Sequence, residues 1–125
     1  MRRRMSAAVG ALPLFLLSLG GGPADARDTS KGREMYGLCG ACHPTDSSNG
    51  AGPGLAGIVG RKAGTAAGFR YSRAMKSSGI IWDDKTLDAY IGDPQRVVPG
   101  NVMPFSGIAD PGEREDLVEY LKTLK

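Results

Sequence analysis

The sequence predicts an all-α domain in which short helices are separated by long loops. No segment alternates apolar and polar residues with the period of two that marks a half-buried strand. Helix-start signals, in which a capping residue precedes a helical stretch, recur through the second half of the chain. Residues 44–68 contain seven glycines and two prolines, a composition typical of an extended loop.

The first 26 residues have the pattern of a secretory signal peptide. Three arginines precede an apolar run of about 13 residues, and Ala24-Asp25-Ala26 fits a small-residue cleavage site after Ala26. An uncleaved membrane anchor is the alternative, but a spanning helix needs about 20 apolar residues, and Pro13 interrupts this run. We therefore expect residues 27–125 to form a single exported domain without stable insertion into a membrane.

The expected mature domain is nearly neutral. Three of the 16 basic residues and one of the 13 acidic residues fall within residues 1–26, so the isoelectric point of about 9.0 owes much to that segment. The remaining domain lacks the basic patch expected of a nucleic-acid-binding protein. Its large apolar residues are few, and a bulky apolar cofactor would supply the missing core.

Five helices are expected in this domain, each with a polar residue able to cap its start. Their expected ranges are 27–42, 72–78, 83–91, 93–98 and 110–124. The last begins with Asp110-Pro111-Gly112-Glu113, which has the spacing of a capping box. Its apolar residues recur at i, i+3, i+4 and i+7, the spacing of one buried face. They are Leu117, Tyr120, Leu121 and Leu124.

Cys39, Cys42 and His43 form a Cys-x-x-Cys-His motif at the end of the first expected helix. Residues three apart on a helix face the same way, so both thiols could add to the two vinyl groups on one edge of a haem. His43 follows at once and could coordinate the iron. The motif therefore predicts attachment of one c-type haem.

Three other chemistries compete for the cysteine pair. A disulfide between cysteines only three positions apart would be strained, and closing so short a loop would stabilise the folded state little. A zinc site lacks further ligands, since the chain has no other cysteine and His43 is its only histidine. A thioredoxin-type dithiol would need a strand just before Cys39, and residues 30–38 show no strand pattern.

The second axial ligand of the iron cannot be a histidine, and a lysine would be unusual. Three methionines remain after residue 26. Met35 shares a helix with the attachment site, and Met75 lies in a short polar helix where core packing is its ordinary role. Met103 lies in a loop stiffened by Pro99 and Pro104, so it is the favoured ligand. Ligation by His and Met fills both axial positions and suits electron transfer.

Beyond the motif, the chain resembles the class I cytochromes c, the mitochondrial type and its soluble bacterial relatives. The resemblance extends over residues 30–125 and is carried by the segments 52–55, 60–62, 68–72, 79–82, 87–91, 99–103 and 113–117. It implies the cytochrome c fold, in which the N- and C-terminal helices pack together while short helices and loops wrap one haem. Gly32 and Tyr36 would then contact Leu117 and Tyr120, with Gly32 allowing close approach.

The resemblance also implies roles at the haem. The Pro53 carbonyl would accept the N–H of His43, and Asn101 would hydrogen-bond a haem propionate. The other implied cofactor contacts are Arg61, Tyr71, Trp82, Tyr90 and Phe105. Arg61 would offset propionate charge, while Tyr71 and Trp82 would hydrogen-bond a propionate. Tyr90 would lie near the Met103 sulfur, and Phe105 would lie beside the haem edge.

Two departures from the family pattern concern packing. One residue fewer than usual separates Tyr36 from Cys39, which predicts a shift in register of the contact between the N- and C-terminal helices. Met75 stands where the family often has a polar residue.

The expected function is that of a periplasmic single-electron carrier, monomeric and not an enzyme, with membrane or periplasmic redox proteins as donor and acceptor. The family's ring of docking lysines is replaced by Leu38, Gln95, Val102, Ala109 and Asp110, leaving Arg96, Lys62 and Lys76. Electrostatic steering should therefore be weak. The alternative is a dedicated haem subunit of a larger periplasmic oxidoreductase. A peroxidase or gas-binding protein would need an open iron site.

Overall fold

A computed structural model of the chain describes residues 29–125. The expected signal peptide at 1–26, its cleavage site and the first two residues of the expected helix at 27–42 lie outside the described residues. Within them the helices are α1 (Thr29–Met35), α2 (Gly37–Gly40), α3 (Arg73–Ser77), α4 (Asp84–Gly92), α5 (Pro94–Val97) and α6 (Pro111–Leu121). Between residues 29 and 125, strand-like pairing is limited to one isolated bridge, and no helix is long and apolar enough to span a membrane. The all-α prediction is confirmed.

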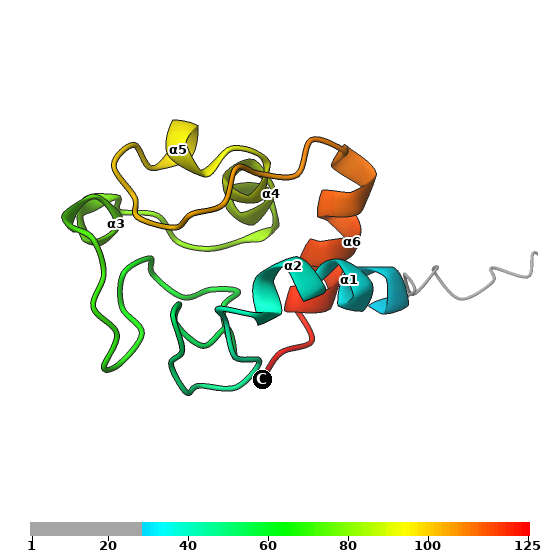
Figure 1. Cartoon of the computed structure of the whole chain (residues 1–125), viewed down its shortest axis with the longest axis horizontal. Helices are drawn as coiled ribbons and strands as arrows, with labels where there is room; N and C mark the ends of the chain where they lie inside the picture. The colour runs from blue at the N-terminus through cyan, green and yellow to red at the C-terminus, as the bar shows by residue number, and fades with distance from the viewer. Residues whose placement is uncertain (1–28) are drawn as a thin grey trace, which may run out of the picture.

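Helices α1 and α6 cross in close contact (Figure 1). A Cβ atom at Gly32 would lie 2.1 Å from the Asp116 carbonyl oxygen and 2.7 Å from the Tyr120 Cβ, so only glycine fits this crossing. The Tyr36 ring meets the Tyr120 ring edge to face, with centroids 5.3 Å apart. Leu117 is fully buried at the same contact. The helix pairing implied by the family resemblance is therefore present.

The first helix differs from the prediction of one continuous helix over 27–42. It is divided at Tyr36 into α1 and α2. The backbone N–H of Cys39 bonds to the Tyr36 carbonyl at 2.9 Å, an i to i−3 bond that tightens this turn. Gly37 and Gly40 both lower helix propensity in this segment. The backbone of Tyr36 stays in the α-helical region, with φ −60° and ψ −19°, so the break is a local change in hydrogen bonding.

The later helices begin at the predicted capping residues. Ser72, Asp83, Asp93 and Asp110 each accept a hydrogen bond from a backbone N–H in the following turn. At α4 the Asp83 N–H in turn donates to the Thr86 hydroxyl oxygen, which completes a capping box that was not predicted from the sequence. At α6 the capping-box bond present is the one from Glu113 N–H to Asp110, at 2.9 Å. Helix α6 ends at Leu121, three residues before the predicted end.

The described chain forms two halves with a hollow between them. One half contains α1, α2 and the glycine-rich loop that follows, and the other contains α3, α4, α5 and the segment 99–110 (Figure 1). The segment 99–110, which carries Met103, turns at two glycines with positive φ, Gly100 at 85° and Gly107 at 111°. We call this segment the Met103 loop.

Candidate haem-binding site

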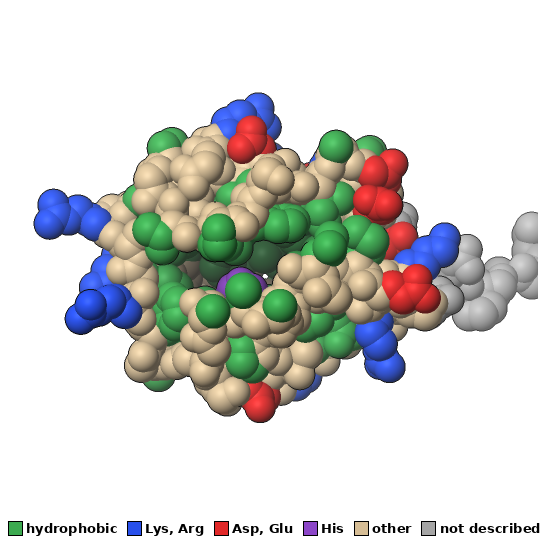
Figure 2. All heavy atoms as spheres, in the orientation of Figure 1, with side chains coloured by type: hydrophobic (Ala, Val, Ile, Leu, Met, Phe, Trp, Pro, Cys, Tyr) green, Lys and Arg blue, Asp and Glu red, His purple; other side chains and the backbone are tan. Residues whose placement is uncertain are grey.

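The hollow is a cavity of about 290 Å³ with walls that are mainly apolar. Figure 2 shows its mouth bordered by hydrophobic side chains, with the histidine visible inside. Cys39, Cys42 and His43 line it from the first half, while Met103 and Phe105 line it from the second. The topology thus brings together residues that lie about 60 positions apart in the sequence.

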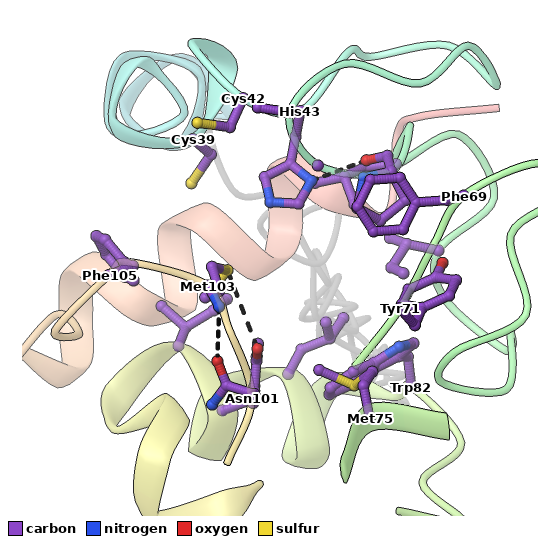
Figure 3. A pocket seen from close by; sticks show the side chains of 18 of the residues that line it. Cys39, Cys42, His43, Phe69, Tyr71, Met75, Trp82, Asn101, Met103 and Phe105 are labelled. Carbon is purple, nitrogen blue, oxygen red and sulfur yellow. Dashed lines mark hydrogen bonds between the residues drawn. The ribbon is translucent and has the colours of Figure 1, made fainter. Parts of the chain in front are cut away.

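His43 is held in one orientation by its neighbours. Its Nδ1 lies 2.8 Å from the Pro53 carbonyl oxygen, and because a carbonyl can only accept, Nδ1 carries the proton. In the neutral imidazole with this tautomer, Nε2 is the nitrogen with a free lone pair, and it faces the cavity (Figure 3). A Cβ at Gly52 would lie 2.5 Å from the His43 ring, so this glycine makes room for the imidazole. Sequence reasoning missed this role of Gly52, because it depends on a contact across the loop.

Tyr36 supports the same histidine from the backbone side. Its hydroxyl donates a hydrogen bond to the His43 carbonyl oxygen at 2.6 Å. Burial, with smaller contributions from Cys39 and Tyr120, raises the pKa of Tyr36 to about 12, so the hydroxyl remains a donor at neutral pH. The sequence analysis gave Tyr36 a packing role only, and this bond adds a second role.

The two cysteines lie at one edge of the cavity as free thiols. Cys42 is exposed and Cys39 is partly buried. Burial, and secondarily the neighbouring Cys42, raises the pKa of the Cys39 thiol. Reactive thiols of redox enzymes have lowered pKa values, so this environment disfavours the dithiol alternative. Two neighbouring thiols on one edge instead fit attachment to adjacent vinyl groups.

Met103 faces the cavity from the half opposite His43 (Figure 3). The Tyr90 hydroxyl lies 4.0 Å from the Met103 sulfur and donates toward it. Burial raises the pKa of Tyr90 to about 12, which keeps this donor protonated. Met75 also lines the cavity, but lies beside Trp82 at the far end. Met35 packs on the core and is not part of the cavity wall.

Asn101 makes several hydrogen bonds within the chain, besides the propionate contact that the resemblance implies. Its side-chain N–H groups donate to the Pro94 carbonyl at 3.0 Å and the Val98 carbonyl at 2.9 Å. Its side-chain oxygen accepts from the Met103 N–H at 3.0 Å. Both amide hydrogens are therefore engaged within the chain, and the hydrogen bond to a propionate stays a prediction. The side chain lines the cavity and fastens the Met103 loop to α5.

The far wall of the cavity combines aromatic rings with one guanidinium. Trp82 is buried and its ring lies 5.0 Å from that of Tyr90. Arg61 lines the cavity while donating to the carbonyls of Gly54 and Ala56, at 3.0 and 3.3 Å. Its positive charge beside an apolar space suits a flat cofactor bearing acidic groups.

Tyr71 and Phe69 complete that wall. Their rings pack edge to face with centroids 4.8 Å apart, and the Tyr71 hydroxyl accepts a bond from the Ala66 N–H at 3.1 Å. Both residues line the cavity, but the sequence analysis named only Tyr71. The hydroxyl of Tyr71 keeps its own hydrogen for donation to a cofactor.

The donor set fits a haem. An imidazole nitrogen and a thioether sulfur face one apolar cavity from opposite halves, and two thiols lie along its edge. Soft sulfur and imidazole are the donors that suit haem iron. The fold and the site together define a small α-helical protein with one covalently attached haem.

Comparison with known proteins identifies the family. Residues 29–125 match the family model described as Cytochrome c. The chain belongs to the cytochrome c family. It is an electron carrier and not an enzyme, and its cofactor is covalently bound haem c.

The relatives include proteins from bacteria. Cytochrome c2 iso-2 of Magnetospirillum molischianum is 51% identical over 89 residues, which cover 70% of this chain and 92% of that relative. Cytochrome c2 of Rhodomicrobium vannielii is 45% identical over 101 residues, covering 78% and 80%. The solved structure of cytochrome cH from Methylobacterium extorquens has a TM-score of 0.74 and 44% identity, covering 77% of this chain and 98% of that one.

Proposed function

We propose that this protein is a monomeric, periplasmic single-electron carrier whose iron is ligated by His43 and Met103. The observation that carries the proposal is the orientation of His43 Nε2 and the Met103 side chain toward one apolar cavity, with Cys39 and Cys42 at its edge. Similarity to proteins named cytochrome c2 supports it further.

The bound haem iron supplies a one-electron redox couple. The residues around it would keep its surroundings unchanged between the two charge states. The Pro53 carbonyl fixes the His43 ring and raises its basicity. The Tyr90 hydroxyl holds the Met103 sulfur, and the apolar walls exclude water. A site that reorganises little on gaining an electron is suited to fast transfer.

Substitution of the two cavity methionines tests the ligand assignment. Met103→Ala should abolish the charge-transfer band that methionine-ligated ferric haem shows, and it should lower the reduction potential. Met75→Leu is the matched control, because Met75 lines the same cavity and should leave the band intact. A parental spectrum and potential in Met103→Ala would refute the assignment.

The periplasmic location is supported by the signal-peptide pattern of residues 1–26. Cell fractionation should place the haem-stained protein in the periplasm. Mass spectrometry of the purified protein should give a chain beginning at Arg27 with one haem added. A protein that retained residues 1–26 in the cytoplasmic fraction would contradict the proposal.

Docking is proposed to occur at the mouth of the cavity. Leu38 and Val102 both line the cavity, and 60% and 76% of their respective surfaces are exposed. Because neutral side chains occupy this rim, the association rate with a redox partner should change only mildly with salt. Stopped-flow electron transfer should thus slow by less than about tenfold between low and physiological ionic strength.

The same exposed apolar rim favours a second candidate, a dedicated haem subunit of a larger periplasmic oxidoreductase. Stable complexes have more apolar contacts than transient ones. Size-exclusion chromatography of a periplasmic extract, followed by haem absorbance, separates the two functions. A diffusible carrier elutes at the size of one chain, and a subunit elutes with a larger complex.

A further inference from the structure

Arg114 joins three parts of the chain near the start of α6. Its Nε donates to Asp88 Oδ1 of α4 at 2.8 Å, and its Nη1 donates to the carbonyls of Ile108 and Ala109 at 3.0 and 2.9 Å. The side chain is only 18% exposed, and it packs over the backbone of Gly92. A guanidinium has a fixed fork of donors, so one side chain can serve the carboxylate and both carbonyls together.

The two carbonyls belong to the downstream end of the Met103 loop. This end also lies against α4, because the Ile108 N–H bonds to the Ile91 carbonyl at 2.9 Å. At Gly107 a Cβ would lie 2.2 Å from the Gly92 carbonyl oxygen, which shows how closely the loop approaches the helix. Arg114 therefore stabilises the close contact between the downstream end of the Met103 loop and α4, which a small shift of the loop would break.

The upstream end of the same loop is held separately. Asn101 bonds to the carbonyls of α5 and to the Met103 N–H, and Gln95 bonds to the backbone of Gly100 and Asn101. Met103 thus lies between an upstream attachment to α5 and a downstream attachment through Arg114. If either attachment is lost, the loop is held less firmly at that end.

We infer that Arg114 is a positioning residue for Met103, which it acts on through Ile108, Ala109 and Asp88 without touching the sulfur. This inference rests on the proposed role of Met103 as the sixth ligand. With Arg114 in place, the downstream end of the loop stays on α4 and the sulfur stays in the cavity. Without it, the loop opens more often and the sixth position becomes accessible to an added ligand.

Competition by imidazole measures this opening in the oxidised holoprotein. Imidazole can occupy the sixth position only when the sulfur has left, so its apparent affinity rises with the open fraction. Arg114→Met should raise that affinity about tenfold over the parent, since bonds made by a charged donor are lost. Amide hydrogen exchange at residues 105–109 should accelerate in parallel.

Lys122 provides a matched control within the same helix pair. Its Nζ contacts Asp84 of α4 and Glu119 of α6, each at 3.0 Å, and it touches no residue of the Met103 loop among its described hydrogen bonds and ion pairs. Lys122→Met therefore removes an α4–α6 ion pair of the same charge type. Its imidazole affinity should stay within about twofold of the parent.

An equal rise in both variants would overturn the inference, because it would show general loosening of the α4–α6 contact. An unchanged affinity in Arg114→Met would overturn it as well. If that variant does not fold with haem, Arg114→Lys decides the question. Lysine keeps the charge but lacks the fork, so an affinity about threefold above the parent is expected and a parental affinity overturns the inference.

The spectrum of the parent separates this inference from the proposed function. A parent without methionine ligation in its oxidised spectrum refutes the role of Met103, and the role of Arg114 is refuted with it. If the parent shows methionine ligation and Arg114→Met binds imidazole with the same affinity as the parent, only the role of Arg114 is refuted.

Discussion

The two halves of the cavity hold their proposed ligands by different means. His43 follows the cysteines directly, and its ring is confined by Gly52 and by the Pro53 carbonyl. Met103 lies in the middle of a long loop whose described attachments are hydrogen bonds to α4, α5 and α6. The histidine is therefore fixed by steric confinement and nearby sequence, while the methionine is held by bonds that can break and re-form.

This difference indicates which half can respond to change. Crowding around His43 leaves little alternative geometry, so substitutions there should cost stability directly. The Met103 loop can open locally while the helices stay packed, so substitutions there should first change the accessibility of the iron. Four variants test this contrast, in order of decreasing expected effect.

The largest effect is expected when the attachment itself is removed. The double variant Cys39→Ala, Cys42→Ala should carry no covalent haem and should have little stable helix, because the apolar cavity would lose its filling. Haem staining of a denaturing gel and far-ultraviolet circular dichroism measure the two losses. Leu38→Ala is the control, since Leu38 adjoins Cys39 but should leave attachment intact. Retained covalent haem in the double variant would contradict the site.

The second largest effect is expected from crowding the histidine. Gly52→Ala would place a Cβ 2.5 Å from the His43 ring, so the ring or its loop must move. The free energy of unfolding of the holoprotein should fall by about 3 kcal/mol. Gly37→Ala is the control, because a Cβ there meets open space in α2. Denaturant titration measures the stability of both variants. Equal stability of Gly52→Ala and Gly37→Ala would refute the confinement of the His43 ring by Gly52.

A smaller loss is expected at the Met103 loop. Asn101→Ala removes three hydrogen bonds, and the backbone groups that made them with Asn101 gain no replacement partner. The free energy of unfolding should therefore fall by about 2 kcal/mol. Unlike Gly52→Ala, it should also raise the apparent affinity for imidazole. Thermal loss of methionine ligation, followed by absorbance, should precede the loss of helix. Simultaneous loss of both would argue against local opening.

The smallest effect is expected from Tyr36→Phe, which removes only the hydrogen bond to the His43 carbonyl. The free energy of unfolding should fall by about 1 kcal/mol at neutral pH. The pKa of Tyr36 is raised from 10.0 to about 12, so the protonated hydroxyl is favoured by folding. Its contribution is full below pH 10 and declines toward pH 12. The parent and the variant should therefore differ less above pH 10, and a constant difference would contradict this assignment.

Much of the fold could be predicted because it depends on short-range signals. Ser72, Asp83, Asp93 and Asp110 cap their helices through bonds to residues three positions away, which the sequence displays directly. The cavity residues were largely predicted as well, through the motif and the family resemblance. Phe69 was missed, although it lies within a segment that carried the resemblance.

The remainder depended on contacts between distant segments. The break at Tyr36 arises where its side chain reaches both Tyr120 and the His43 carbonyl. The bond between Arg114 and Asp88 spans 26 positions and has no local pattern. Asn101 could be predicted to be polar and important, but which partners occupy its amide group follows only from the position of α5.

The positive φ angles at Gly100 and Gly107 have a consequence for engineering. These two corners set the direction of the backbone at either end of residues 101–106. Residues 102–106 can therefore be varied while Asn101, whose side chain fastens the loop to α5, is kept. A library that varied them while preserving both glycines would sample new sixth ligands, and so new reduction potentials, on an unchanged scaffold.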